Sequence, residues 1–193
     1  EVFSSDISGW GDVSLLGRVA LHKDESGKHY YSLLAGLKEP TGNTNEKLSA
    51  GEKAEVDHQP GSGSWDPLLG VAYSTQLDAQ WGVSSNLLYH LTTEGARETT
   101  VGDRLMYNAA VLWSPARRSH SHSHHDDANN NHAQYVWQYV LELNGEWHDR
   151  TEIDGSKDDN TGGDVIYAAA GLRWSYADWG THISLGTPLY KNL

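Results

Sequence analysis

The stretch from residue 65 to residue 95 alternates apolar and small or polar side chains, a pattern that predicts one complete β-hairpin. Glycine, serine, asparagine and histidine fill the positions between the apolar ones. A soluble sandwich would bury the apolar face, whereas a membrane-spanning barrel turns that face to lipid and keeps the other face polar. The apolar positions are Leu69, Val71, Tyr73, Trp81, Val83, Leu87, Tyr89 and Leu91.

The same alternation recurs along the chain and predicts eight strands joined as neighbouring hairpins. No helical period and no run of 18 apolar residues interrupts it, so a transmembrane helix is not expected. The sequence predicts an all-β fold, an up-and-down antiparallel transmembrane β-barrel, with eight strands visible as part of a larger barrel and residues 1–193 as one domain. The expected strands are 11–22, 29–38, the two arms of the hairpin in 65–95, 105–114, 135–146, 165–176 and 179–190.

Aromatic residues favour the membrane version of this fold. Ten Tyr and eight Trp accompany a single Phe, and rings with one polar end suit the membrane interface. Pairs such as Trp81 with Tyr89, or Tyr167 with Trp174, lie roughly seven to ten residues apart, near opposite ends of their strands. A tilted strand needs about 9–11 residues to cross a bilayer, so such pairs are expected to form two interfacial girdles on the lipid-facing side. A soluble barrel or sandwich stays open as the alternative, because a single Trp is often a core residue.

Composition narrows the possible partners. The chain has 193 residues, a formal net charge of −12 and a mean hydropathy of −0.62. An acidic chain without a basic surface argues against nucleic acid as a partner. The absence of cysteine removes disulfides, thiolate metal sites and thiol nucleophiles. A half-polar strand pattern keeps hydropathy low, so the mean value does not argue against a barrel.

Several short phrases resemble a known family. They are Gly11-Asp12-Val13, the segment 36–42, the segment 59–67, the segment 89–95, Gly102-Asp103-Arg104, and the segment 141–147. Together they resemble an outer-membrane barrel family, the transporters of the "MetA pathway of phenol degradation" type. The Pro-Thr-Gly at 40–42 and the Pro-Gly-Ser-Gly-Ser-Trp-Asp at 60–66 are the most specific part of the likeness.

The resemblance implies an outer-membrane β-barrel of a Gram-negative bacterium that moves small molecules. Outer-membrane lipid and small-molecule solutes are then the expected partners. Relatives have further strands before the segment matching Gly11 and one more after the segment matching 188–193, so the chain is expected to lack N-terminal strands and the last C-terminal strand. Some relatives are encoded near heavy-metal efflux systems, which makes histidine-rich segments relevant.

Residues 115–133 form a His-rich loop insertion and the only ligand-dense cluster in the sequence. Imidazoles beside carboxylates suit Zn, Cu, Ni or Co, although a flexible loop offers no fixed geometry to discriminate between these metals. No cofactor is required by the sequence, and a solvated low-complexity insertion is the alternative interpretation. The candidate ligands for a divalent metal are His120, His122, His124, His125, Asp126, Asp127 and His132.

Polar side chains on the inward positions of the predicted strands would line the lumen. They could form a pore-lining field that selects solutes, or pair into a network that fills the interior. The expected lining residues are Arg18, Lys38, Asn86, His90, Arg104, Asn108, Glu142, Glu146, Arg173 and His182.

No catalytic motif emerges, so the chain is not expected to be an enzyme. Neither a Gly-x-Ser-x-Gly elbow nor a His-Glu-x-x-His helix is present. The expected function is a passive pore or transporter for small molecules, linked to heavy-metal handling through the His-rich loop. Two alternatives stay open: an outer-membrane protein that sequesters metal without transport, and a soluble acidic β-barrel that binds a small ligand.

Overall fold

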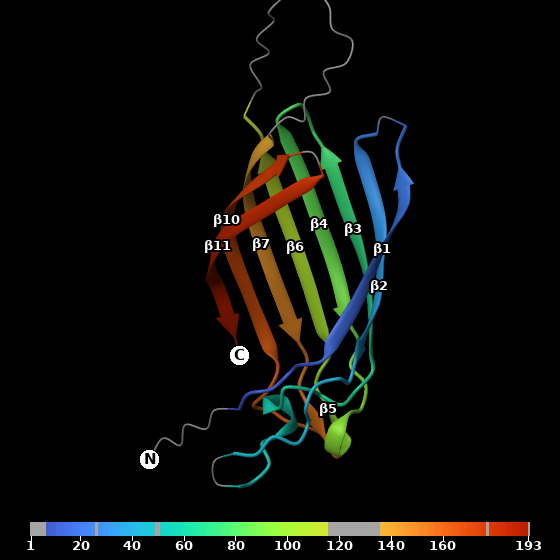
Figure 1. The fold of residues 1–193 in the computed structure, drawn as a ribbon, viewed down its shortest axis with the longest axis vertical. Coiled ribbons are helices and arrows are strands. Elements are labelled where there is room, and N and C mark those ends of the chain that lie inside the picture. Colours follow the sequence, from blue (N-terminus) through green and yellow to red (C-terminus); the bar gives the residue numbers. More distant parts are fainter. Residues whose placement is uncertain (1–6, 26, 49–50, 116–135, 177, 193) are drawn as a thin grey trace, which may run out of the picture.

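Eight long strands form one antiparallel sheet in a computed structural model that describes residues 7–25, 27–48, 51–115, 136–176 and 178–192 (Figure 1). Their order in the sheet is β1-β2-β3-β4-β6-β7-β10-β11, so neighbours in sequence are neighbours in space. This confirms the predicted all-β, up-and-down antiparallel arrangement. The strands are β1 Val13–Lys23, β2 His29–Glu39, β3 Asp66–Gln76, β4 Trp81–His90, β6 Arg104–Trp113, β7 Val136–His148, β10 Gly163–Tyr176 and β11 Trp179–Asn192.

The sheet is curved but does not close on itself. Strands β1 and β11 are its two edges, and they do not pair with each other. Every described position of β11 is exposed, because no strand covers its outer edge. Since β1 and β11 lie seven places apart in an antiparallel sheet, their directions are opposite, which is the arrangement that antiparallel pairing requires.

Two short turns at one end of the sheet, between β1 and β2 and between β3 and β4, are held by aspartate side chains. Asp78 Oδ1 accepts the backbone N–H groups of Gln80 and Trp81 at 2.7 and 2.8 Å. Asp24 Oδ1 accepts two backbone N–H groups in the same way in the turn between β1 and β2. Aspartate favours such turns because its short side chain can replace a backbone acceptor.

The loops 40–65, 91–103 and 149–162 gather at the opposite end of the sheet, where Figure 1 shows β5. They contain a small three-stranded sheet and two 3-10 helices, which alternation could not predict because two-residue strands have no period. Within the described residues, no helix is long and apolar enough to cross a membrane. The small elements are η1 Val56–His58, η2 Ala96–Glu98, β5 Thr99–Thr100, β8 Glu152–Ile153 and β9 Ser156–Lys157.

The large sheet has one apolar and one polar face, as the alternation predicts. The apolar face is open: Val19 is 62% exposed, Leu141 66% and Leu185 84%. Only four hydrophobic residues among those described are buried, and two of them, Ala54 and Val56, belong to a loop. The sheet therefore has almost no hydrophobic core of its own.

The pairing of Tyr167 with Trp174 as two ends of one aromatic face is wrong. The register places Trp174 opposite Trp137 but Tyr167 opposite Asn144, on the polar face. Seven residues is an odd spacing, and side chains an odd number of positions apart point to opposite faces of a strand. Trp81 and Tyr89, eight residues apart, share the apolar face as predicted.

We expect Gly70→Ala to destabilise the sheet, because a Cβ at Gly70 would lie 2.4 Å from the backbone oxygen of Leu87 on β4. Overpacking of this kind costs about 1–3 kcal/mol, which a lowered urea midpoint of the lipid-reconstituted protein would report. Gly17→Ala is the matched control, because its Cβ would meet Ala35 O at an ordinary 3.6 Å. Equal midpoints for the two variants would contradict this reading of Gly70.

Candidate functional site

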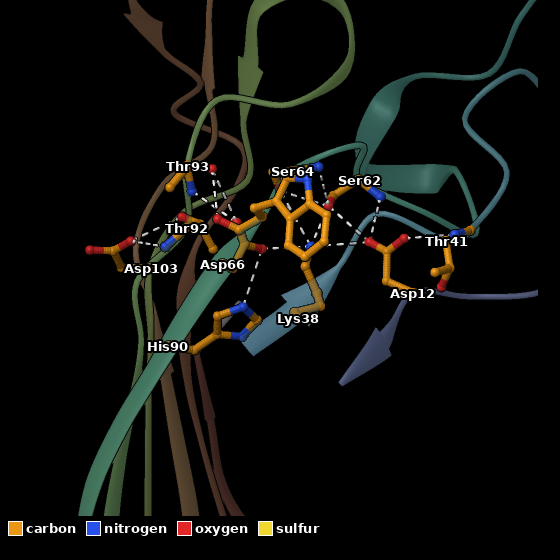
Figure 2. A network of polar contacts seen from close by, with 12 residues as sticks. Asp12, Lys38, Thr41, Ser62, Ser64, Asp66, His90, Thr92, Thr93 and Asp103 are labelled. Carbon is orange, nitrogen blue, oxygen red and sulfur yellow. Dashed lines mark hydrogen bonds and ion pairs between the residues drawn. The ribbon is translucent and has the colours of Figure 1, made fainter. Parts of the chain in front are cut away.

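Lys38 lies at the centre of a polar network where the sheet meets its loops (Figure 2). It stands opposite Asp66 in the register of β2 and β3, and its Nζ lies 2.5 Å from Asp66 Oδ2. The same Nζ lies 3.1 Å from Oδ2 of Asp12, which precedes β1. All three side chains are nearly buried, with exposures of 11% for Lys38, 7% for Asp12 and 1% for Asp66. One cation thus pairs with two carboxylates from different segments.

Asp12 joins the first loop to this centre. Its Oδ1 accepts the N–H of Gly42 at 2.9 Å, and its Oδ2 accepts both the N–H and the hydroxyl of Ser62 at 2.9 Å. The two loop segments approach closely, since a Cβ on Gly61 would lie 2.6 Å from the carbonyl carbon of Gly42. Both ends of the loop 40–65 are therefore held by one carboxylate, and glycine permits the contact.

The second loop is held by Asp66 and Asp103. Asp66 Oδ1 accepts the N–H of Thr93 at 2.9 Å, and Asp103 Oδ1 accepts the N–H of Thr92 at 2.7 Å. His90 Nε2 lies 3.2 Å from Asp66 Oδ2, with its side chain 13% exposed. In Figure 2, dashed lines join Thr93 and His90 to Asp66, and Thr92 and Asp103 form a separate pair beside them. The network therefore continues from β2 across to β4.

Asp12 and Asp103, the two network carboxylates that lie outside the strands, have lowered pKa values. Burial raises the pKa of Asp12, but two backbone N–H groups, the Lys38 ammonium and a hydroxyl lower it by more, so the pKa lies below the ordinary 3.8. Burial likewise raises the pKa of Asp103, but hydrogen bonds from Tyr89 and Thr92 lower it by more. The pKa of Asp103 therefore also lies below 3.8. Both groups are anions at neutral pH, as their hydrogen-bond partners require.

A pocket of about 210 Å³ lies between this network and the loops. Its sheet side carries polar groups, including Arg104 and His90, whereas loop residues form the rest of the wall. The enclosing loop residues include Val56, Gln59, Pro60 and Val101. A charged, half-enclosed pocket at the end of a polar sheet face can bind or filter small polar solutes.

The ten residues expected to line a lumen share one face of the sheet by its register. Several of them meet: Asn108 Nδ2 donates to Asn86 Oδ1 at 2.7 Å, and His182 Nε2 lies 3.9 Å from Glu142 Oε1. Arg18 Nε donates to a serine hydroxyl at 3.0 Å. The remaining members are Lys38 and His90 in the network, Arg104 and Glu146 at 3.9 Å from each other, and Arg173 opposite His182.

The predicted metal ligands lie outside the described residues, so the metal hypothesis stays a prediction. This applies to His120, His122, His124, His125, Asp126, Asp127 and His132. In the part of the chain that the structure describes, no group of three or more His, Asp or Glu side chains is arranged to hold a metal ion.

A model of the family described as "Putative MetA-pathway of phenol degradation" matches residues 2–121, more than half of the chain. The chain belongs to this family. Among curated proteins, none matches it. The family match covers β1 to β6 and therefore every residue of the polar network described above.

Of the network residues, Lys38 and His90 were predicted only as lumen-lining residues and the others were not predicted as a site, yet the phrases that resembled the MetA-pathway family contain them. Asp12, Ser62, Asp66, Thr93 and Asp103 each lie in one of those phrases. In the structure these sequence segments meet at one end of the sheet, where their residues bond to one another. The signal that could have found them is a set of acidic and hydroxyl residues at strand ends, beside glycine and proline.

We expect Lys38→Met to release the loops, because it keeps the side-chain length but leaves Asp12 and Asp66 facing each other without a cation. Breaking a buried ion pair on one side costs about 3–5 kcal/mol. Limited proteolysis within 40–65 should accelerate, and adding Asp12→Asn should restore part of the resistance. Lys157→Met is the control, since its pair with Asp149 is half exposed and such pairs contribute about 0–1 kcal/mol. Equal effects of the two lysine variants would contradict the central role of Lys38.

Acid should loosen the same loops. The folded pKa values of Asp12 and Asp103 lie below 3.8, so their stabilisation is fully present above that unfolded value and is lost as pH falls through the folded values. Hydrogen exchange in 40–65 and 91–103, corrected for intrinsic rates, should stay constant from pH 7 to pH 5 and rise below about pH 4. In Asp12→Asn, exchange in 40–65 should already be fast at pH 7. Loosening centred near pH 6 would implicate histidine instead.

Proposed function

We propose that this chain forms the wall of an outer-membrane β-barrel and acts as a passive pore for small solutes. The observation that carries the proposal is the two-faced sheet: one face exposes its apolar side chains, and the other carries the polar residues. A water-soluble monomer rarely exposes a continuous apolar patch larger than a few hundred Å². Lipid is the solvent that makes such a face favourable.

Aromatic rings support the proposed orientation in a membrane. Trp81 and Trp113 lie 6.4 Å apart, Trp113 and Tyr139 lie 5.4 Å apart, and Trp137 and Trp174 lie 6.4 Å apart. These rings form a band across β4, β6, β7 and β10 near the short-turn end. Tryptophan and tyrosine prefer the interface between lipid and water, so this band fits one boundary of the hydrocarbon layer.

The polar face supports a conduit for anions rather than cations. The whole chain has a net charge of −12, yet on this face the described strand side chains include more cations than carboxylates. The cations are Arg18, Lys38, Arg104, Arg173 and Lys191, and the carboxylates are Asp66, Glu142 and Glu146. A wall of one predominant sign concentrates counter-ions of the other sign.

Strand number sets a condition on this proposal. Eight strands closed alone leave an interior that side chains fill, whereas a wider barrel leaves a channel. A conducting pore therefore needs further strands between β1 and β11. The two open edges and their opposite directions are compatible with that completion.

The test is single-channel conductance and reversal potential of the full-length protein in planar bilayers under a KCl gradient. We expect stable conductance steps with preference for chloride, and Arg18→Glu should shift the reversal potential toward potassium. Lys53→Glu makes the same charge change in an exposed loop and should shift it much less. Bilayer insertion without conductance would overturn the pore and leave a filled barrel. A monodisperse protein without detergent would overturn the membrane assignment in favour of a soluble ligand-binding barrel.

A further inference from the structure

Three nitrogen-bearing side chains stand in one row across the sheet beneath the loops. The register pairs His90 on β4 with Arg104 on β6, and Arg104 with His148 on β7. Neighbouring strands lie about 4.7–4.9 Å apart, so the guanidinium of Arg104 is flanked by an imidazole on each side. The row lies on the polar face, and both Arg104 and His90 line the 210 Å³ pocket.

Two nitrogen atoms in this row are buried without a partner, and Arg104 Nε always carries a proton. Arg104 Nε and His148 Nε2 have no hydrogen bond with any described residue. The ion pair of Arg104 with Glu146 is long, with Nη1 3.9 Å from Oε1. Unpartnered buried polar atoms are rare and cost about 1–3 kcal/mol each. An acceptor that meets the N–H of Arg104 Nε would therefore be bound favourably.

The carboxylates of the pocket do not supply that acceptor. Asp12 and Asp66 share the Lys38 ammonium and accept backbone N–H groups from the loops. Both carboxylates therefore already have partners within the network. The guanidinium of Arg104 keeps most of its donors and has a side-chain exposure of 40%, so a solute can reach it.

The loop wall of the pocket is partly apolar. Val56, which is only 6% exposed, lines it together with Pro60 and Val101. The volume of about 210 Å³ is several times the roughly 30 Å³ that one water molecule occupies. A ligand that satisfies both walls has an oxyanion at one end and a short apolar body at the other.

We propose that this pocket binds a small organic carboxylate, with the carboxylate on Arg104 beside His90 and the apolar body against Val56 and Val101. Arginine suits this role because its planar fork binds a carboxylate through two parallel hydrogen bonds. The biological role of this site, as a binding site that a solute occupies at the loop end of the channel, rests on the proposed pore. The binding itself requires no conductance.

Calorimetric titration of the full chain in detergent micelles tests the site with three probes. Benzoate carries both the oxyanion and the apolar body, benzamide has the same shape without charge, and inorganic phosphate is an anion without an apolar body. We expect saturable benzoate binding, with benzamide and phosphate at least about tenfold weaker, a difference of roughly 1.4 kcal/mol. Phosphate binding as tight as benzoate would overturn the organic carboxylate as the ligand class.

Charge-neutralising variants locate the binding. Arg104→Gln should weaken benzoate at least tenfold, whereas Arg173→Gln, on the same face but outside the pocket, should not. Glu146→Gln should tighten benzoate severalfold, because it removes the carboxylate that competes for the guanidinium. A purely structural role for Arg104 would not produce that gain. Unchanged affinity in Arg104→Gln, or no gain in Glu146→Gln, would overturn the proposal.

Two further measurements keep the test decisive. If Arg104→Gln fails to fold by circular dichroism, Val101→Ser takes its place and should weaken benzoate without changing phosphate binding. An equal effect on both probes would overturn the apolar wall. Benzoate binding without any conductance would support the site and overturn the pore, whereas conductance without benzoate binding would support the pore and overturn the site.

Discussion

The ammonium group of Lys38 joins the sheet to its loops, and the loop end of the structure depends on it. Its partners are Asp12, ahead of the first strand, and Asp66, at the start of the third. Removing three charges from water is costly, and their attraction repays that cost only when the remaining hydrogen-bond capacity is also used. Loop hydroxyl and N–H groups, such as those of Ser62 and Thr93, meet that requirement. The groups that stabilise the ions are thus the groups that position the loops.

A polar network, rather than a hydrophobic core, holds the loops, because most apolar side chains lie on the open face of the sheet. The alternating strands place them on one open face, and the loops contribute only a few, among them Ala54 and Val56, which are buried. A small hydrophobic cluster could not hold two long loops against their conformational entropy. The loop end is therefore stabilised by charge and hydrogen bonds, so that changes of charge should affect it more than changes of side-chain volume.

Much of the sheet could be predicted from the sequence, because a period of two determines which face each side chain occupies. The predicted strand 29–38 differs by one residue from β2 His29–Glu39. The same rule shows why the Tyr167 prediction failed, since an odd spacing changes face. Alternation cannot identify partners, however. Asp12 and Ser62 are 50 positions apart, and nothing in either strand pattern indicates that they meet.

Asp66 connects the loop-holding network to the row formed by His90, Arg104 and His148. It accepts Lys38 on one side and His90 on the other, and His90 is the register neighbour of Arg104. The strands alone fix Arg104, whereas the loops supply the apolar wall at Val56. Attraction for negative charge is therefore a property of the sheet, and preference for an apolar body is a property of the loops. A change that frees the loops should leave the attraction for anions and remove the preference for an apolar body, so selectivity among anions depends on the ion network.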